Sequence, residues 1–191
     1  MKKIISVISL KGGTGKTTIA VNVASSLKVE LLDCDPQGSA REWNACSVRN
    51  MPVVPGWEQR VSKLEGVFII DGPPTLGIAA TSIIKVSDLI LIPCTPSGLD
   101  IASTGQLLNL IGDKSEVWLI PSKVDMRTSV GKQIVEALEE FNIPVTESIG
   151  QRSAHISAFS ESRSISEYAT RSKANTDILH LVKRIKSWLK K

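Results

Sequence analysis

Residues 10–18 read LKGGTGKTT, and this stretch decides how the chain folds. The apolar run IISVI at 4–8 precedes it and predicts a buried strand, and Ile19, Val23 and Leu27 follow at the four-residue spacing of a helix that packs on a sheet. A strand that passes through glycines into a helix leaves several backbone N–H groups unpaired at the helix N-terminus, where the helix dipole also favours negative charge. The stretch therefore predicts a phosphate-binding loop.

Two side chains of this loop are suited to phosphate and metal chemistry. Lys16 can reach the outer phosphates as a point charge, and the Thr17 hydroxyl stands where such loops coordinate Mg²⁺. The structural alternative is a glycine-rich turn that carries two solvated lysines, Lys11 and Lys16. The order of strand, loop and helix favours the phosphate site.

The loop resembles the deviant Walker A motif, KGGxGK[ST], of the ParA/MinD ATPases. An ordinary P-loop has a glycine five residues before Gly15, whereas this chain has Leu10 there and Lys11 immediately before two glycines. The resemblance implies bound ATP and Mg²⁺, and it implies that Lys11 reaches across a dimer to the partner's nucleotide. The nucleotide contacts that it implies in this loop are Lys11, Gly12, Gly13, Thr14, Gly15, Lys16, Thr17 and Thr18.

Two acidic segments follow predicted strands. Residues 33–38 read DCDPQG after an apolar run, and residues 71–74 read DGPP after the run VFII. Because parallel strands deliver their carboxyl ends to one edge of a sheet, we expect both segments to lie beside the P-loop. Asp71 suits the Walker B position, where it holds the metal through water.

The first acidic segment, DCDPQG, resembles the ParA-family segment after the second strand. The resemblance implies that Asp35 positions or activates the attacking water and reaches the metal through water. The structural alternative is that Asp33 and Asp35 merely cap a helix that begins near Ser39.

Later segments extend the resemblance more weakly. Residues 93–100, PCTPSGLD, resemble a ParA-family loop near the dimer face, most closely that of the small ParA group that includes ParF. Pro121 and Asp125 lie in the segment where relatives place their adenine-contacting loop. The spacing of Ile149, Arg152 and Glu167 fits a family motif in which Ser162 replaces a common glycine, so the local loop conformation of relatives does not transfer automatically.

The C-terminal fifth of the chain is the basic part. Residues 151–191 contain nine Lys and Arg against three Asp and Glu, in a chain whose formal net charge is only +4. A polyanionic partner is therefore predicted for this segment. The side chains that we expect to contact DNA phosphates are Arg152, Arg171, Lys173, Lys183, Arg184 and Lys186.

The apolar side chains of residues 174–190 recur at helical spacing, and this face allows two roles. The helix can dock on its own sheet, or it can lie on anionic lipid as the MinD branch does with its C-terminal helix. Its close connection to the core favours docking. His155 and His180 stand alone and are expected to be solvated or to cap helices.

Length and composition predict one domain over residues 1–191. Three cysteines without CxxC spacing indicate neither a disulfide framework nor a zinc or iron–sulfur site. No apolar run approaches the roughly 20 residues that cross a bilayer. Lys2 and Lys3 imitate the start of a secretory signal, but the apolar stretch after them is short and runs into Lys11, so we expect a cytoplasmic protein.

Together these features predict a P-loop α/β fold with a mostly parallel, twisted sheet of about seven or eight strands and helices on both faces. The resemblance implies a slow ATPase for DNA partition that dimerises with ATP, binds nonspecific double-stranded DNA on the nucleoid, and is stimulated by a ParB-type centromere-binding protein. A membrane partner is not expected. Two alternatives remain: a MinD-like membrane-cycling positioning ATPase, and a metabolic P-loop ligase such as the dethiobiotin synthetase group.

Overall fold

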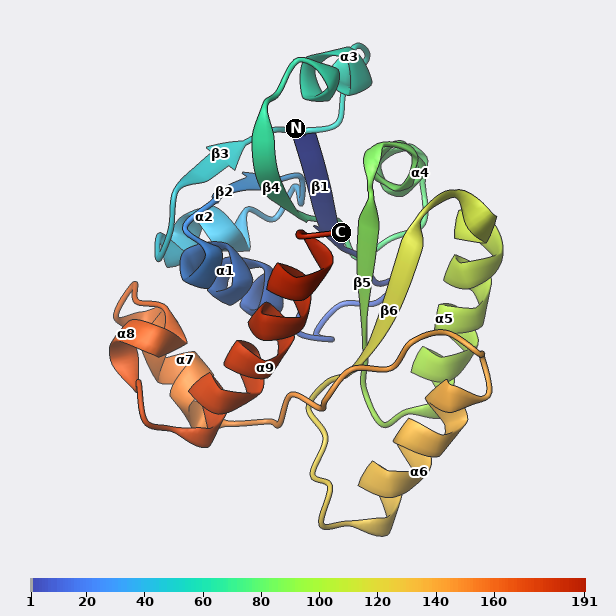
Figure 1. Cartoon of the computed structure of the whole chain (residues 1–191), viewed down its shortest axis with the longest axis vertical. Coiled ribbons are helices and arrows are strands. Elements are labelled where there is room, and N and C mark those ends of the chain that lie inside the picture. The colour runs from blue at the N-terminus through green and yellow to red at the C-terminus, as the bar shows by residue number, and fades with distance from the viewer. Residues whose placement is uncertain (1) are drawn as a thin grey trace.

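The structure, a computed structural model, describes residues 2–191 except for the side chain of Lys114. Within these residues six strands form one sheet, and all neighbouring strands are parallel (Figure 1). The order across the sheet is β3-β2-β4-β1-β5-β6. The strands are β1 (Lys2–Val7), β2 (Glu30–Asp33), β3 (Val48–Asn50), β4 (Gly66–Asp71), β5 (Leu89–Cys94) and β6 (Glu116–Pro121).

The sheet is smaller than the seven or eight strands that we predicted. Residues 145–149 form only isolated parallel bridges, from Val145 to Leu119 and from Ile149 to Ser122. Between these bridges the segment advances by one residue more than β6 does. The segment and β6 therefore fall out of register, and a continuous ladder of hydrogen bonds does not form between them. The segment lies along the edge of β6 without becoming a strand.

Helices cover both faces of the sheet, as predicted. One face carries α1 (Lys16–Leu27), α2 (Ser39–Trp43), α7 (Ser153–Ser160), α8 (Ile165–Tyr168) and α9 (Lys173–Trp188). The other face carries α3 (Trp57–Ser62), α4 (Ile78–Val86), α5 (Gly98–Ile111), which continues into a 3₁₀ turn (Gly112–Lys114), and α6 (Ser129–Glu139) (Figure 1). None of the helices described is both long and apolar enough to cross a bilayer.

The core lies in two layers because successive strand residues point to opposite faces. In β1, Ile5 and Val7 pack under α1 and α9, whereas Ile4 packs under the other helix layer. Since both faces are covered, the central strands are continuous apolar runs rather than alternating ones. This is why the short run at 4–8 was readable as a buried strand.

The last helix docks on its own sheet, as predicted. The apolar side chains on one side of the helix are buried, namely Ile178, Leu181, Val182, Ile185 and Trp188, whereas Leu179 is 45% exposed. The Trp188 indole donates a hydrogen bond of 2.8 Å to the Glu116 carboxylate at the start of β6. The apolar face of α9 is therefore occupied by the protein's own core.

Candidate functional site

The carboxyl ends of three neighbouring strands meet at one level of the sheet. Val7, the last residue of β1, is in register with Asp71 at the end of β4, and Asp71 is in register with Asp33 at the end of β2. The glycine loop follows β1, so the sheet itself brings the loop and both acidic segments together. Open α/β sheets bind ligands outside this edge. The predicted convergence of the three segments is confirmed.

The loop at 10–18 has the backbone of a phosphate cradle. Gly13 and Gly15 have φ of 76° and 95°, a left-handed conformation that favours glycine. Gly15 is the residue before α1, so the amides of the first turn remain free to bind an anion. The Ser122 hydroxyl at the end of β6 donates to the Thr14 carbonyl at 2.7 Å. A β-carbon at Gly15 would approach that hydroxyl to 3.0 Å, so the position admits little besides glycine.

Lys16 is buried at the start of α1 with 6% of its surface exposed. Its amino group donates a 2.8 Å hydrogen bond to the Lys11 carbonyl across the loop. Burial lowers the pKa of Lys16, and the carboxylates of Asp71 and Asp35 oppose that shift. A buried ammonium that faces two carboxylates and a ring of amides gains a strong counterion when a phosphate enters.

Asp71 is the most buried acid of the site. It is 0% exposed, and among the described residues neither of its carboxylate oxygens has a hydrogen-bond partner. Burial raises the pKa of Asp71 to about 7, while the Thr17 hydroxyl and Lys16 act in the opposite direction. An orphaned buried carboxylate of this kind calls for a ligand.

The residues present fit a magnesium ion that is shared with a nucleotide. Mg²⁺ keeps several waters and is usually held by one or two carboxylates together with substrate phosphates. Asp71 supplies a carboxylate without a partner, and Thr17 supplies a hydroxyl beside it. Within residues 2–191 no cluster of three or more His, Cys, Asp or Glu side chains could hold a metal by itself, so phosphate oxygens would have to complete the shell.

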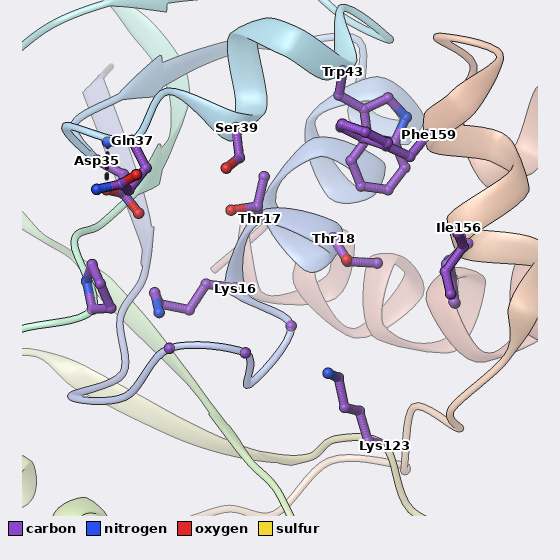
Figure 2. A pocket seen from close by; sticks show the side chains of 15 residues that line it. Lys16, Thr17, Thr18, Asp35, Gln37, Ser39, Trp43, Lys123, Ile156 and Phe159 are labelled. Atoms are coloured by element: carbon purple, nitrogen blue, oxygen red, sulfur yellow. Dashed lines mark hydrogen bonds between the residues drawn. The ribbon is translucent and has the colours of Figure 1, made fainter.

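A cavity of about 470 Å³ opens above this edge, within the range usual for small-molecule sites. Its floor is the glycine loop with Lys16, Thr17 and Thr18, and Asp35 lies in its wall (Figure 2). The Asp35 carboxylate accepts a 3.0 Å hydrogen bond from the backbone N–H of Gln37, and this bond holds the orientation of the carboxylate. Lys16, Thr17 and Asp35 therefore border one space, whereas Asp71 is buried at the same edge of the sheet and is not among the described residues that line it.

Aromatic side chains that we did not predict form another wall of this cavity. Trp43 of α2 and Phe159 of α7 meet edge to face, with ring centroids 5.4 Å apart (Figure 2). The Trp43 indole also donates to the Arg163 carbonyl at 2.8 Å, which ties the α7 region to α2. The sequence gives no sign of this role for Trp43, because a tryptophan in an irregular segment carries no signal of what it will face.

A second, smaller cavity of about 160 Å³ adjoins the first. The two cavities share Gly15, Thr18, Lys123, His155 and Ile156 in their walls. Figure 2 shows the Lys123 side chain extending from the loop after β6 toward the glycine loop. Lys123 has a φ of 59°, an uncommon conformation for a residue other than glycine that often marks functional sites.

As far as residues 2–191 show, the two predicted adenine contacts line neither of these cavities. Pro121 is buried within β6. Asp125 is exposed and forms a 2.7 Å ion pair with Arg127, whose guanidinium lowers the pKa of the Asp125 carboxyl. The loop contributes Ser122 and Lys123 to the cavities instead.

His155 differs from the expectation that it would be solvated or a cap. It is only 9% exposed, and among the described residues neither ring nitrogen has a hydrogen-bond partner. Burial lowers the pKa of His155, with Asp177 opposing the shift and Arg152 reinforcing it. His180 is exposed, as expected. A lone histidine in a polar segment carries no periodic signal that would have placed it in a cavity wall.

Lys11 is not among the described residues that line the phosphate cavity of its own chain. Its amino group forms a 3.0 Å ion pair with Asp100 in the first turn of α5, and the Asp100 side chain is itself largely buried. Only the Lys11 backbone, through its carbonyl, contacts Lys16. The structure thus assigns the two lysines of the loop different surroundings.

The basic residues predicted to meet DNA fall into two groups. Arg152 pairs with Asp177 at 3.0 Å, and Arg184 donates to the Val145 carbonyl at 2.9 Å while its guanidinium lies 4.8 Å from the centre of the Trp118 ring. These two arginines bind within the fold. The others are exposed: Arg171, Lys173, Lys183 and Lys186.

Curated proteins of two kinds are similar to this chain over most of its length. "Maintenance of carboxysome distribution protein A" of Gloeobacter kilaueensis is 31% identical over 185 residues, which cover 87% of this chain and 85% of that protein. Sporulation initiation inhibitor protein Soj of Bacillus subtilis is 27% identical over 249 residues, covering 97% of this chain and 98% of Soj.

A solved structure confirms the fold, and a family model confirms the ancestry. The MinD cell division protein of Aquifex aeolicus superposes with a TM-score of 0.81 at 16% identity over 97% of each chain, which shows the fold alone. The model described as the CobQ/CobB/MinD/ParA nucleotide binding domain matches residues 5–165. That range contains the glycine loop and both acidic segments. The chain therefore belongs to the CobQ/CobB/MinD/ParA nucleotide-binding family and has the P-loop fold of its ParA and MinD members.

Proposed function

We propose that this protein is a partition or positioning ATPase that hydrolyses ATP slowly and switches its contacts with DNA through the nucleotide. One observation carries the proposal: the glycine loop and Asp35 line a single cavity at the carboxyl edge of the sheet, and the buried carboxylate of Asp71 ends a neighbouring strand at the same edge. Carboxylates beside a phosphate cradle suit phosphoryl transfer, in which positioning and charge neutralisation supply most of the rate.

The roles of the individual residues follow from their places. The loop amides and the Lys16 ammonium bind the phosphates and offset their charge, and Thr17 with Asp71 holds Mg²⁺. Asp35, oriented by the Gln37 amide, hydrogen-bonds the attacking water in line with the terminal phosphate. Because Lys16 and Lys123 are the only lysines or arginines among the described residues that line this cavity, hydrolysis by one chain is expected to be slow.

Lys11 supports a role for a second copy of the chain. Its amino group is held on Asp100 rather than over its own phosphate loop, so it is displayed at the edge of the site. Exposed apolar side chains occur at the same edge of the sheet: Leu76 and Ile78 after β4 are 57% and 84% exposed, and Leu99 after β5 is 71% exposed. An exposed apolar patch with charged residues at its rim is typical of a protein–protein interface. We infer an ATP-dependent homodimer in which Lys11 completes the partner's charge shell.

The proposed DNA contact uses the exposed cations of the C-terminal segment. Arg171, Lys173, Lys183 and Lys186 offer charge without a built shape for reading bases, which favours phosphate contacts and no sequence preference. A ParB-type centromere-binding protein, or the adaptor of another cargo, would then stimulate hydrolysis and release. Such a protein would act in the cytoplasm on the nucleoid.

The membrane-cycling alternative needs the apolar face of α9. That face is buried in the core, so lipid binding would require the helix to leave its sheet. The buried face therefore favours DNA over lipid as the surface that the ATP form binds.

A mobility-shift assay with random-sequence duplex and ATP, ADP or no nucleotide tests the proposal, together with ATP hydrolysis and sedimentation. We expect the wild type to dimerise and to shift the duplex with ATP alone. Lys16→Gln should lose nucleotide binding, whereas Lys11→Ala should bind ATP within about threefold of wild type, a difference below about 1 kcal/mol, yet neither dimerise nor shift DNA. Lys132→Ala on α6, an exposed lysine on the opposite helix layer, is the matched control.

DNA binding that ignores the nucleotide and both substitutions would defeat the switch. ATP-dependent sedimentation with anionic vesicles and not with DNA would support the MinD-like alternative. ATP consumption that is indifferent to DNA and depends on a small carboxylic acid would favour a metabolic ligase.

A further inference from the structure

A buried ion pair closes the turn that carries Asp35. Asp33 ends β2 and is only 1% exposed. One oxygen of its carboxylate, Oδ2, accepts a 3.0 Å hydrogen bond from the guanidinium of Arg41 on α2. Burying a carboxylate is costly unless it is paired and hydrogen-bonded. Arg41 therefore supplies the counterion for the acid at the end of the strand.

The same carboxylate holds the backbone of the residue that we assign to the attacking water. Oδ1 of Asp33 accepts a 3.1 Å hydrogen bond from the backbone N–H of Asp35. The side chain of Asp35 lines the phosphate cavity, where it accepts a hydrogen bond from the backbone N–H of Gln37 (Figure 2). Asp33 thus links Arg41 to Asp35, with one carboxylate oxygen on each.

The backbone between Asp35 and Arg41 leaves room for the arginine to cross it. Gly38 has a φ of 72°, and a β-carbon at this position would overlap the guanidinium of Arg41. The amide of Gly38 donates to the Asp35 carbonyl at 3.0 Å, and the amide of Arg41 donates to the Gly38 carbonyl at 3.0 Å. Residues 33–41 therefore form one closed unit around the carboxylate of Asp33.

We propose that Arg41 is a positioning residue for ATP hydrolysis: through Asp33 it fixes the backbone of Asp35, whose carboxylate orients the attacking water. This proposal rests on the proposed function, since it takes Asp35 as the group that orients the water. Neither Arg41 nor Asp33 is among the described residues that line the phosphate cavity, so the pair would act through Asp35 and not by contact with the nucleotide. Phosphoryl transfer depends on alignment, and a misplacement of about 1 Å can lower a rate about 100-fold.

The test measures kcat, KM and ATP affinity of the full chain and follows ATP-dependent dimerisation by sedimentation. For Arg41→Ala we expect kcat to fall about 10-fold, because the carboxylate of Asp35 is no longer held in line with the phosphate. KM, ATP affinity and dimerisation should stay within about twofold of the wild type, since no contact with the nucleotide is removed. Arg41→Lys keeps a cation that can reach Asp33 but lacks the planar fork of the guanidinium, so it should restore part of kcat.

A near-isosteric variant keeps the proposal testable if Arg41→Ala does not fold. Asp33→Asn leaves no unpaired buried charge and still offers an oxygen to the Asp35 amide, but it no longer forms the ion pair that holds it in place. It should lower kcat about as far as Arg41→Ala, and the double variant should lose no more than the single ones, because the two residues act as a unit. Wild-type kcat in folded Asp33→Asn, or losses that multiply in the double variant, would overturn the proposal.

The matched control is the ion pair at the other end of the same strand. Arg49 of β3 pairs at 2.7 Å with Glu30, the first residue of β2, and its side chain is partly exposed, as that of Arg41 is. Arg49→Ala should leave kcat and KM unchanged. An equal loss of kcat in Arg49→Ala and Arg41→Ala would assign the effect to the strand as a whole and overturn the proposal.

The outcomes separate this proposal from the one on which it rests. A wild type that does not bind and hydrolyse ATP would refute the proposed function. A wild type that does both, with a folded Arg41→Ala variant of unchanged kcat, would refute only the positioning role of Arg41. A loss confined to ATP affinity would do the same, because it would show a contact with the nucleotide and not an effect on the attacking water.

Discussion

Ser162 shows how one residue can hold a conformation that its side chain disfavours. It follows α7 with a φ of 52°, its amide donates to the Phe159 carbonyl at 3.0 Å, and the Arg163 amide donates to the Ala158 carbonyl at 3.0 Å. This pair of bonds is the Schellman arrangement that ends helices, and glycine is usual at its left-handed position. Ser162 therefore adopts the left-handed backbone that glycine usually supplies at this position of a helix end.

The left-handed conformation of Ser162 predicts that Ser162→Gly stabilises the protein. A residue other than glycine loses roughly 1–2 kcal/mol in this region, and the added flexibility of glycine in the unfolded chain returns about half of that gain. We expect the free energy of unfolding to rise by about 0.5–1 kcal/mol in urea denaturation.

Ser160→Gly is the matched control. Ser160 lies two residues earlier, at the end of α7, where the backbone is helical. Glycine there should lower the free energy of unfolding by roughly 0.5–1 kcal/mol. Equal effects of the two substitutions would contradict the role given to the φ of Ser162.

The position of α9 depends on one carboxylate that serves two indoles. Glu116 at the start of β6 accepts from Trp118 at 2.9 Å and from Trp188 of α9 at 2.8 Å, and both tryptophans are buried. Lys3 lies 5.0 Å from the centre of the Trp188 ring. These contacts, together with the apolar face, fix the end of the helix on the edge of the sheet.

Removing this acceptor should therefore loosen α9. Glu116→Ala leaves two buried N–H groups unpaired, and we expect it to lower the free energy of unfolding by about 1–3 kcal/mol in urea denaturation, with ATP affinity unchanged. Glu116→Gln retains an acceptor oxygen and should cost less. An Ala variant as stable as the wild type would show that the apolar face alone positions the helix.

The distribution of exposed positive charge over the two helix layers indicates which face of the protein would bind DNA. The exposed cations Lys173, Lys183 and Lys186 belong to α9 on one layer, whereas Lys132 belongs to α6 on the other. Arg152 and Arg184 hold the fold together, so fewer side chains are free than the sequence alone indicates.

Salt dependence tests this arrangement. If about six phosphates are engaged by the dimer, DNA affinity should fall by roughly 10³ between low and moderate salt. Lys183→Gln should lower the slope of log affinity against log salt by about 1 per site, because one phosphate contact is lost. Lys132→Gln should leave the slope unchanged. A slope that responds to Lys132 and not to Lys183 would place the DNA on the other helix layer.

Much of the fold and of the phosphate site was predictable, because the information is local. The glycines at 12–15 permit the loop backbone, the apolar run before them requires a strand, and Asp71 at the end of another apolar run requires the same sheet edge. Each signal lies within a few residues, so periodicity and turn chemistry suffice to read it. The larger sheet that we expected did not form, because the register of the 145–149 segment against β6 depends on pairing, which is not local.

By itself the sequence determined the glycine loop between strand and helix, the acidic residues at the same edge of the sheet, the family and the two-layer architecture, since each follows from residue chemistry at short spacing. Only the tertiary structure decided that Ser122 supports Thr14 from 108 residues away, that Lys11 rests on Asp100, and that His155 is buried without a partner among the described residues. The physical reason is that burial and pairing are properties of surfaces that meet. In the cavities beside the glycine loop, those surfaces come from α7 and from the loop after β6, which are segments far apart in the chain.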